Sequence, residues 1–509
     1  AAASTAESTA SSTAAASTAE STGSYTDYSA GFPENVTIQI PVYDRGFENW
    51  NPTDNYYTRW IQSEFGDKYN VTVKYVAIAR SNEVQDFNQM IAAGNAPTII
   101  FHYDMPAAVN YWSEGAEQPI DLDEVAYYAP TYWDNMKDTI ETYGKLDGEN
   151  AFIFAERDPI YYNWVTLIRK DWLDNLGLDM PTTQEEFVEV LRAFKNDDPN
   201  GNGVADEIPT GGRAEARWMG QLFGQYGIAM WEGYPQWDIY DGELTYSAVT
   251  KNMRDCLEWM SGLYAEGLLD PETFLNDKAA WDGKINSGVV GIWEHLPQEC
   301  YNYAENIYNG TGVKPEIAVL PAISAPGYEG YYTMHQMNGG GFVVANTDDE
   351  AKIDRIMKVL DAYGNQDLWM KFYNGVEGMH SEVVNGESVR LPDDPSTQQN
   401  LVLVPFNQIA TIDFQVNVLS SQLTDDRAWA VSQAIENVQE NQKYVKSFAG
   451  DGMPESITSD YPDIANRTLY IEYATKIITG EYSIDKFDEF VEKWYATGGT
   501  EVTEKAREW

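Results

Sequence analysis

The stretch NVTIQIPVYD at residues 35–44 alternates apolar and polar side chains, which is the pattern of a β-strand with one buried face. Helix, strand, helix and strand patterns follow in turn at residues 56–68, 71–78, 83–93 and 98–102. Strands that alternate with helices indicate an α/β domain with a doubly wound sheet. In such sheets ligands bind beyond the carboxyl ends of the strands.

A second α/β unit is expected to begin near residue 160. It opens with a strand and a helix, and a later hairpin turns on Asp241-Gly242, a favourable two-residue turn. Beyond residue 365 the periodicity is mostly helical. The predicted elements are strands at 164–169, 237–246 (the hairpin), 288–293, 317–320 and 340–345, and helices at 183–195, 252–266, 348–363, 425–443 and 485–495.

The length and charge of the chain limit the classes of function. A chain of 509 residues is too long for one ordinary core, so two or more domains are expected. With 80 acidic against 33 basic residues, the formal net charge is -47. That charge argues against nucleic acid, whose binding depends on neutralising phosphates. It also disfavours anionic membranes and polyanionic ligands, unless a local pocket reverses the sign. The 16 Trp and 34 Tyr residues favour recognition of sugars by aromatic faces.

The N-terminal segment differs in composition from the rest. The sequence AAASTAEST at residues 1–9 recurs at 14–22, and residues 1–31 are almost wholly Ala, Ser, Thr and Glu. Without an apolar period this segment cannot bury a core, so we interpret it as a disordered tether. A long polar tether ahead of a globular body suits a protein held at a cell surface. Any anchor, such as a lipid-modified Cys, is expected before Ala1.

The chain has two cysteines, Cys256 and Cys300. They could pair, but two cysteines are not a disulfide framework, and their separation in space is unknown at this point. Cys256 lies in an amphipathic helical pattern, which favours a buried free thiol. There is no run of eighteen apolar residues, so no membrane-spanning helix is predicted.

The stretch DPNGNGVADEIP at residues 198–209 predicts a calcium loop. Oxygen-bearing side chains alternate along it, and Gly201 and Gly203 permit tight turns. Loops of this type end with a bidentate Glu at position twelve, where this chain has Pro209, so closure falls to the preceding Asp-Glu pair. The competing interpretation is an acidic surface loop that binds nothing. We favour a structural Ca²⁺ site whose ligands are Asp198, Asn200, Asn202, the Val204 carbonyl, Asp206 and Glu207.

Five stretches together resemble the extracellular solute-binding proteins of bacterial carbohydrate ABC transporters, of the family 1 type. The nearest group is the long lipoprotein branch of Gram-positive bacteria. The resemblance covers residues 35 to about 380 well and the helical tail loosely. The stretches are FNQMIAAGNAPTII at 87–100, IRKDWLDNLGL at 168–178, the loop at 197–209, LYAEGLLDP at 263–271 and NGVEGMH at 374–380.

The resemblance implies an α/β protein with a two-lobe periplasmic-binding-protein-like fold, hinge strands and an extra helical C-terminal region. The two lobes close on an oligosaccharide, which is then delivered to ABC permease subunits in the membrane. The protein is expected to be an extracellular monomer tethered to the outer face of the cell membrane. The chain crosses between lobes near 158, 318–322 and 365. The expected division is a tether at 1–31, lobe 1 at 32–158 plus 321–365, and lobe 2 at 159–320 plus 366–509.

Sugar binding needs aromatic faces and convergent hydrogen-bonding groups, so candidate contacts are aromatic and polar residues near the strand ends and in loops between lobes. For any one Trp among them, packing in the core is a comparably good interpretation, and for Trp164, Trp218 and Trp231 it is slightly the better one. The candidates are Tyr43, Asp44, Trp50, Asn51, His102 and Tyr103 from the first lobe, Tyr162, Trp164, Arg213, Trp218, Trp231, Trp293, Glu294 and His295 from the second, and His335 and Gln336 before the bend at 339–341.

No catalytic motif emerges from the sequence. The four His residues have no zinc spacing, the Gly-Gly-Gly at 339–341 lacks the Lys of a phosphate loop, and no serine lies in a nucleophile elbow. The alternative function is a secreted glycoside hydrolase, which needs two carboxylates about 5–9.5 Å apart. A third hypothesis is a polysaccharide-adhesion module with an exposed aromatic platform. The ordered motifs favour the binding protein.

Overall fold

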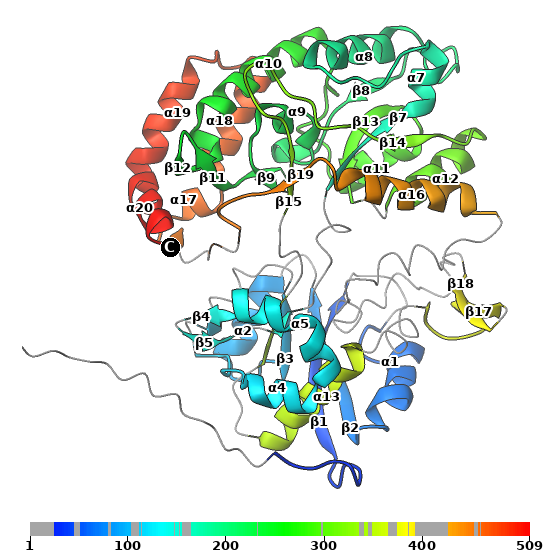
Figure 1. The fold of residues 1–509 in the computed structure, drawn as a ribbon, viewed down its shortest axis with the longest axis vertical. Helices are drawn as coiled ribbons and strands as arrows, with labels where there is room; N and C mark the ends of the chain where they lie inside the picture. Colours follow the sequence, from blue (N-terminus) through cyan, green and yellow to red (C-terminus); the bar gives the residue numbers. More distant parts are fainter. Residues whose placement is uncertain are drawn as a thin grey trace, which may run out of the picture.

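The computed structural model contains two α/β bodies, which Figure 1 shows one above the other. The first body combines the N-terminal part of the chain with residues 341–364, and the second is built mainly from residues 164–334 and 426–509. The structure describes residues 25–44, 51–79, 83–102, 111–112, 115–146, 148–151, 153–154, 164–231, 233–296, 299–334, 341–344, 349–364, 374–384, 386–391, 426–451, 453, 457–458 and 460–509.

The first body is organised on β1 (Val36–Asp44), as the alternating stretch at 35–44 predicts. It pairs in parallel with β2 (Val71–Ala79), in register from Val36 opposite Val71 to Asp44 opposite Ala79. A second small sheet has the order β3 (Ile99–His102), β16 (Gly341–Val344), β6 (Ile153–Phe154), with β16 antiparallel to both neighbours. The Gln39 amide donates to Thr98 Oγ1 at 3.1 Å, which ties β1 to the start of β3.

Helices cover this first body and enclose its core. Alternate residues of β1 are buried. Ile38 and Ile40 have at most 1% of their surface exposed and pack with Phe65, Tyr128 and Ile356. The helix predicted at 56–68 begins at a capping box between Asn55 and Thr58 and continues as a π-helix. The helices are α1 (Tyr56–Ile61), η1 (Gln62–Gly66), α2 (Glu83–Ala92), α4 (Leu122–Tyr128), α5 (Pro130–Tyr143) and α13 (Glu350–Gly364), with a short hairpin of β4 (Lys145–Leu146) and β5 (Glu149–Asn150).

The second body is built on a four-stranded sheet of order β14, β7, β13, β8. The strands are β14 (Ile317–Val319), β7 (Val165–Arg169), β13 (Val290–His295) and β8 (Ile208–Thr210). Strand β13 runs antiparallel to β7 and parallel to β8. The carboxyl ends of β13 and β8 therefore lie at the same edge of the sheet as the start of β7.

Helices and two hairpins surround this sheet. The hairpin predicted on Asp241-Gly242 is present, with β11 (Trp237–Tyr240) paired to β12 (Glu243–Tyr246). The other elements are α7 (Lys170–Leu176), α8 (Gln184–Asn196), η3 (Ala214–Ala216), α9 (Gly220–Phe223), η4 (Gly224–Tyr226), β9 (Met230–Trp231), β10 (Tyr234–Pro235), η5 (Ser247–Val249), α10 (Lys251–Glu266), α11 (Lys278–Asn286) and α12 (Glu299–Thr311).

The C-terminal region is helical, as predicted, and packs on the second body (Figure 1). The Asn437 amide donates to the Ile317 carbonyl at 2.9 Å, joining α16 to β14. The Trp494 ring stacks on Tyr246 of the hairpin at 5.4 Å between centroids. The elements are α16 (Ala428–Asn441), β19 (Val445–Ser447), α17 (Pro462–Ala465), α18 (Thr468–Ile478), α19 (Lys486–Trp494), η9 (Tyr495–Gly499) and α20 (Thr500–Glu508).

Two segments pack differently from the predicted division into lobes. Ile323 and Ala325, assigned to lobe 1, belong to the core of the second body, and β15 (Tyr332–Met334) pairs with β19 there. The segment around β17 (Ser381–Val384) and β18 (Glu387–Arg390), assigned to lobe 2, lies against the first body, where Tyr56 Oη and His380 Nε2 are 2.7 Å apart. Sequence periodicity finds elements but not which core receives them. The boundaries themselves stay a prediction.

The end of the predicted tether is also held in place. Residues 1–24 lie outside the described residues, whereas Tyr25 and Tyr28 pack on the first core. The Thr26 amide donates to Tyr128 Oη at 2.6 Å. The prediction of disorder through residue 31 is therefore wrong for residues 25–31. The reason is that two tyrosines interrupt the small polar residues and supply apolar surface to bury.

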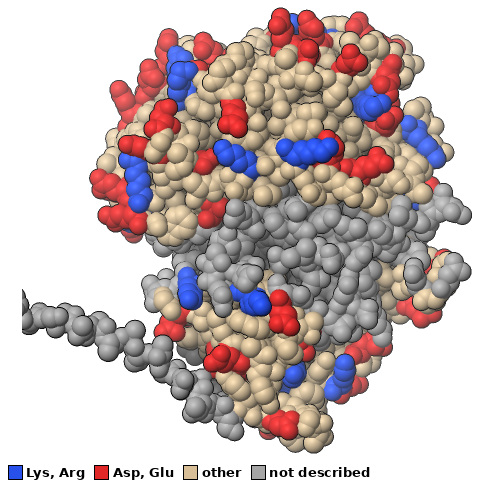
Figure 2. All heavy atoms as spheres, viewed as in Figure 1, with Lys and Arg blue, Asp and Glu red and all other residues tan. Residues whose placement is uncertain are grey.

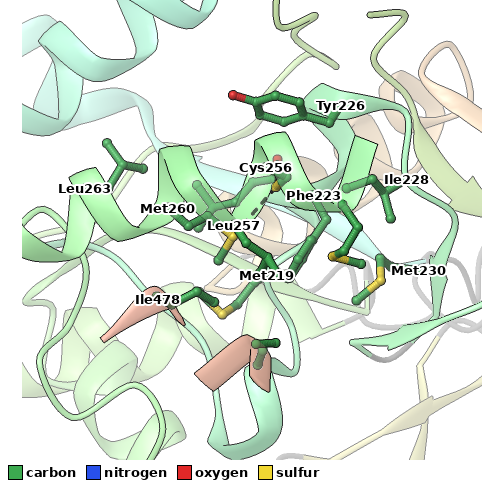
Figure 3. Packing of buried hydrophobic residues seen from close by; sticks show 14 of the residues in the cluster. Met219, Phe223, Tyr226, Ile228, Met230, Cys256, Leu257, Met260, Leu263 and Ile478 are labelled. Atoms are coloured by element: carbon green, nitrogen blue, oxygen red, sulfur yellow. Dashed lines mark hydrogen bonds between the residues drawn. The ribbon is translucent and has the colours of Figure 1, made fainter. Parts of the chain in front are cut away.

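Both cysteines are free and fully buried. Figure 3 shows Cys256 among Met260, Leu257 and Phe223 in the core between α9 and α10. Cys300 belongs to a different cluster of buried residues, where Asn437 contacts its Sγ at 3.2 Å. The expected buried thiol at Cys256 is confirmed, and the open question of pairing is answered by two separate thiols.

Acidic side chains are spread over both bodies on the face that Figure 2 shows, with fewer basic ones among them. A net charge of -47 distributed in this way favours solubility. Within the described ranges, no helix has the length and apolar character that crossing a membrane requires.

Candidate functional site

Five of the predicted sugar contacts come together at one edge of the second sheet. His295 ends β13 and lies opposite Val165, the first residue of β7, so Trp164 lies beside it. Thr210 ends β8 at the same edge, and the loop that follows carries Arg213 and Trp218. This is the edge at which ligands of α/β sheets are expected.

Aromatic rings make up the centre of this edge. The Trp164 ring lies 4.8 Å from Trp218 and 5.5 Å from His295, and the Trp218 and His295 rings are 5.0 Å apart, all measured between centroids. Trp231 contacts Trp164 edge-on at 6.5 Å and is half-buried, whereas the three central rings are 4–6% exposed. We call Trp164, Trp218, Trp231, His295 and Arg213 the strand-end cluster.

Each of the three central residues has one ring nitrogen without a hydrogen bond to the described part of the chain. Within the described part of the chain, Trp164 Nε1, Trp218 Nε1 and His295 Nε2 are buried and have no partner. The other His295 nitrogen, Nδ1, accepts the Leu296 amide at 2.8 Å. Burial, followed by the charge of Lys278, lowers the pKa of His295 to about 3, so the ring is neutral. A neutral ring whose Nδ1 accepts carries its proton on Nε2.

Arg213 adds a positive charge to the cluster. Its guanidinium carbon lies 4.1 Å from the centroid of the Trp218 ring. Such stacking desolvates one face of the guanidinium and fixes its orientation. The backbone supports this geometry, since the Arg213 amide donates to the Arg217 carbonyl at 2.8 Å.

Polar side chains from the segment between α10 and α11 hold the loop before Arg213 in place. The Gly212 amide donates to Thr273 Oγ1 at 2.7 Å, and Asn276 Nδ2 donates to the Gly212 carbonyl at 3.2 Å. Asn276 in turn donates to Asp270 Oδ2 at 2.8 Å. A side chain at Gly212 would meet Met219 Cγ at 2.3 Å, so the loop can pass only with glycine.

Sequence reasoning missed this supporting network. Asp270 belongs to the stretch LYAEGLLDP, which was used only as part of the family resemblance. Tyr303, whose ring lies 5.3 Å from His295 and whose hydroxyl donates to Asp282, was also missed. The sequence did hold a signal for Tyr303. The helix α12 follows β13 after a short connection, so the first turns of α12 are expected to pack near the end of β13.

Two predicted contacts are structural instead. Trp293 is fully buried and packs against Tyr303 at 6.0 Å, so it is a core residue. Glu294 is 9% exposed, and its Oε2 accepts the Gly220 amide at 2.9 Å, which holds the start of α9. Both were predicted because they lie near the end of a strand. All six residues of β13 are buried, so that position alone does not separate a contact residue from a core residue.

The candidates from the first body are only partly described. Asp44 and Asn51 are exposed, and Asn51 Oδ1 accepts the Thr53 amide at 3.0 Å in a local turn. Tyr43 lies in β1 and His102 ends β3, as predicted, while their side chains lie outside the described residues. The remaining candidates fall wholly outside the described residues; they are Trp50, Tyr103, Tyr162, His335 and Gln336.

The predicted calcium loop has the expected turns. Asp198, Gly201 and Gly203 have φ values of 47°, 69° and 76°, which is the left-handed region. Its side-chain oxygens turn inward and accept the loop's own amides. Asn202 N–H donates to Asp198 Oδ1 at 3.1 Å, and Gly203 N–H donates to Asp198 Oδ2 at 3.0 Å.

Glu207 is the distinctive ligand candidate. Its Oε1 is buried with no hydrogen-bond partner in the described part of the chain. Burial raises the pKa of Glu207, and the nearby charges of Asp206 and Asp198 raise it further. In the described ranges, no three His, Cys, Asp or Glu side chains are gathered in a group that could hold a metal ion. The other predicted ligands of the loop are the carboxylates of Asp198 and Asp206, the side-chain amides of Asn200 and Asn202, and the Val204 carbonyl.

A family model for the bacterial extracellular solute-binding protein matches residues 49–367, more than half of the chain. The chain belongs to this family. Its members are solute-binding proteins and not enzymes, so the family resemblance is confirmed and the hydrolase alternative is not supported.

Two relatives from Bacillus subtilis (strain 168) are similar to this chain over most of its length. Lipoprotein LipO is 26% identical over 445 residues, which cover 84% of each chain. The polygalacturonan/rhamnogalacturonan-binding protein YtcQ is 25% identical over 437 residues, covering 83% of this chain and 82% of YtcQ.

Solved structures of solute-binding proteins share its fold. The S. pneumoniae ABC-transporter substrate-binding protein FusA in complex with kestose has a TM-score of 0.68 at 18% identity, covering 93% of this chain and 98% of FusA. The alginate-binding protein AlgQ2 without calcium ion has a TM-score of 0.67 at 20% identity, covering 94% and 98%. The predicted periplasmic-binding-protein-like α/β fold is thereby confirmed.

Proposed function

We propose that this solute-binding protein captures an oligosaccharide between its two α/β bodies and delivers it to the permease subunits of an ABC transporter. The observation that carries the proposal is the strand-end cluster, where ring faces and unpartnered N–H groups lie together at the ligand-binding edge of a sheet. Relatives and neighbours named for polygalacturonan, kestose and alginate support a carbohydrate.

The cluster has the chemistry that sugar recognition requires. Ring faces pack against the C–H surfaces of a pyranose, and ring N–H groups donate to its oxygens. Trp231, which is half-buried at the rim, is the ring best placed to stack on an arriving sugar. The first body supplies its contacts from the ends of β1 and β3.

The first prediction concerns Trp231→Ala. Loss of a ring that stacks on the sugar is expected to weaken oligosaccharide binding about 10- to 100-fold. Calorimetric titration against a panel of neutral and acidic oligosaccharides measures the affinity. Trp509→Ala, which removes a half-exposed Trp at the end of α20, is the control and should bind like the unaltered protein.

Chromatography of the titrated sugars separates binding from hydrolysis. Intact sugar with a weakened Trp231→Ala variant agrees with capture. Equal affinity of the variant and the unaltered protein for every sugar that binds would remove Trp231 from the site. Shortened sugar products would instead support the alternative hypothesis of a glycoside hydrolase.

We also propose that the N-terminal segment tethers this protein to the outer face of the cell membrane through a lipid anchor. The family is extracellular, and the name of LipO as a lipoprotein supports attachment. The first residues of the described chain, 25–34, lead into β1 at the first body, so the tether joins that body rather than the second.

A structural Ca²⁺ in the loop at 198–207 is a further part of the proposal. The donor set is hard oxygen throughout, from Asp198, Asn200, Asn202, the Val204 carbonyl, Asp206 and Glu207, which suits Ca²⁺. The buried Glu207 Oε1 without a partner fits a position awaiting a cation. The structure of AlgQ2 named for the absence of calcium supports the assignment. The ion would lock the loop that follows α8.

The second prediction follows from linkage between binding and stability. A ligand at 100 times its Kd stabilises the folded state by about 2.7 kcal/mol, so Ca²⁺ should raise the melting temperature of the second body by several degrees over chelator. Glu207→Gln should abolish most of that shift. Glu189→Gln, an exposed carboxylate on the preceding helix α8, should keep it. Identical melting curves with Ca²⁺ and with chelator would exclude the site.

A further inference from the structure

The strand-end cluster offers hydrogen-bond donors and no acceptor among its central groups. Trp164 Nε1 and Trp218 Nε1 can only donate, and His295 Nε2 carries the proton of a neutral ring whose Nδ1 is already engaged. The Arg213 guanidinium, stacked on Trp218, also only donates. A sugar hydroxyl both donates and accepts, so a site for neutral hydroxyls would be expected to contain both kinds of group.

An indole N–H without a partner does not by itself indicate a ligand. Trp172, Trp281 and Trp293 also lack partners for Nε1 within the described residues, and all three are fully buried core residues. The strand-end cluster differs in two respects. Its unpartnered nitrogens include a histidine, and its rings lie against a guanidinium at the strand-end edge of the sheet.

We propose that the strand-end cluster binds the carboxylate of an acidic oligosaccharide, so that the captured sugar contains uronic acid units. This inference rests on the proposed function and names its substrate class. A carboxylate is an acceptor-only group, and it is complementary to indole and imidazole N–H groups around a guanidinium. Arg213 pairs with the charge, and the ring nitrogens complete its hydrogen bonds.

The strongly acidic composition does not oppose this assignment at the site. Charges more than about 8–10 Å apart are largely screened at physiological salt, so the nearest groups decide. Among the described residues, Glu294 accepts the Gly220 amide, and Asp282 accepts the Tyr303 hydroxyl and forms an ion pair with Lys278. Besides burial, the charges of Lys278 and Asp282 act on the pKa of His295 in opposite directions. The charge of Arg213 lowers that pKa, so Arg213 adds positive potential at the ring.

The loop that carries Arg213 is built to hold it still. Gly212 is fixed on both sides by Thr273 and Asn276, and Asp270 is fixed by Asn276 and by Lys284 Nζ at 2.7 Å. A preorganised guanidinium loses little freedom on binding, which favours affinity and specificity. Asp270 and Asn276 are therefore positioning residues for the charge.

The test compares galacturonic acid trisaccharide with its methyl ester, which has the same ring stereochemistry and no charge. The unaltered protein should bind the acid at least tenfold more tightly, and its affinity should fall with added salt. Arg213→Gln should weaken binding of the acid about 10- to 100-fold and remove its preference over the ester. Arg192→Gln, which removes an exposed arginine on α8, is the matched control and should change neither affinity.

Galacturonate is one of several uronic acids, so the same comparison of acid and methyl ester is made with oligosaccharides of mannuronate, guluronate and glucuronate. Preference for any one of them over its ester, lost in Arg213→Gln, supports the inference. Tight binding of a neutral sugar that is unchanged in Arg213→Gln, with no acidic sugar preferred to its ester, overturns the acidic assignment and leaves the proposed capture of oligosaccharide standing. Absence of binding by every acidic and neutral sugar overturns both.

Discussion

Glu117→Gln is expected to stabilise the first body at neutral pH. Glu117 is 4% exposed, and neither of its carboxyl oxygens has a hydrogen-bond partner within the described chain. It lies between Ala116, whose amide donates to the Tyr111 carbonyl, and Gln118, whose amide donates to the Val344 carbonyl. Burial raises the pKa of the Glu117 carboxyl from 4.5 to about 9. An ionised carboxylate at this place would be desolvated without compensation.

The sign of the pH dependence follows from which state binds the proton. Between about pH 4.5 and 9 the folded protein keeps a proton on Glu117 that the unfolded chain has released. Glu117 therefore lowers stability progressively as the pH rises through this window. At about 1.4 kcal/mol per pH unit, the cost at pH 7 is on the order of 3 kcal/mol.

Glutamine has a similar shape and no proton to bind, so the variant should gain stability most at high pH. Calorimetric unfolding at pH 5, 7 and 8.5 measures this, and the difference between variant and unaltered protein should grow across the series. Glu149→Gln changes an exposed carboxylate of the same body and should stay within about 0.5 kcal/mol at each pH. A variant that is destabilised, or equally stable at all three values, would show that Glu117 is charged and compensated in the folded state.

Most helices and strands were predictable because their signals are local. The alternation at 35–44 gives β1, and Asp241-Gly242 gives the turn between β11 and β12. Alternation fails where both faces of a strand are covered. All six residues of β13 are buried, so no alternation of apolar and polar residues marks which face meets the site. The sequence therefore could not show that His295 joins the site and Trp293 packs in the core.

The strand-end cluster was predictable in its residues but not in its chemistry. Trp164 and His295 are 131 positions apart in the sequence. They meet because β13 pairs with β7 in a register that no local sequence pattern predicts. The donor-only character depends on one backbone amide, that of Leu296, occupying His295 Nδ1. Likewise, nothing in the sequence around Glu117 distinguishes it from the other acidic residues, because its pKa is set by packing.

Arg355→Met is expected to destabilise the first body and to release the segment that joins it to the tether. Arg355 lies in α13 with no exposed surface, between the rings of Tyr28 and Phe32 at 4.4 and 4.1 Å. Its Nε donates to the Tyr69 carbonyl at 2.9 Å, and Nη2 donates to the Glu34 carbonyl at 3.4 Å. One side chain thus fastens residues 28–34 to the body.

Methionine fills much of the same volume but cannot donate, so the variant loses two charge-assisted hydrogen bonds and two cation–π contacts. The expected loss is about 2–4 kcal/mol, since each such hydrogen bond contributes about 1.5–3 kcal/mol and a desolvated cation–π contact about 1–2, partly offset by the apolar contacts that remain.

Limited chymotrypsin digestion is the second readout, because it cuts after Tyr25, Tyr28 and Phe32 once they are released. Arg59→Met removes an exposed arginine paired with Asp54 in the same body and should change stability by less than about 1 kcal/mol and leave the cleavage rate unaltered. If Arg355→Met is cut between residues 25 and 34 no faster than Arg59→Met, the segment is held by its tyrosines packing on the first core, and Arg355 only fills space beneath it.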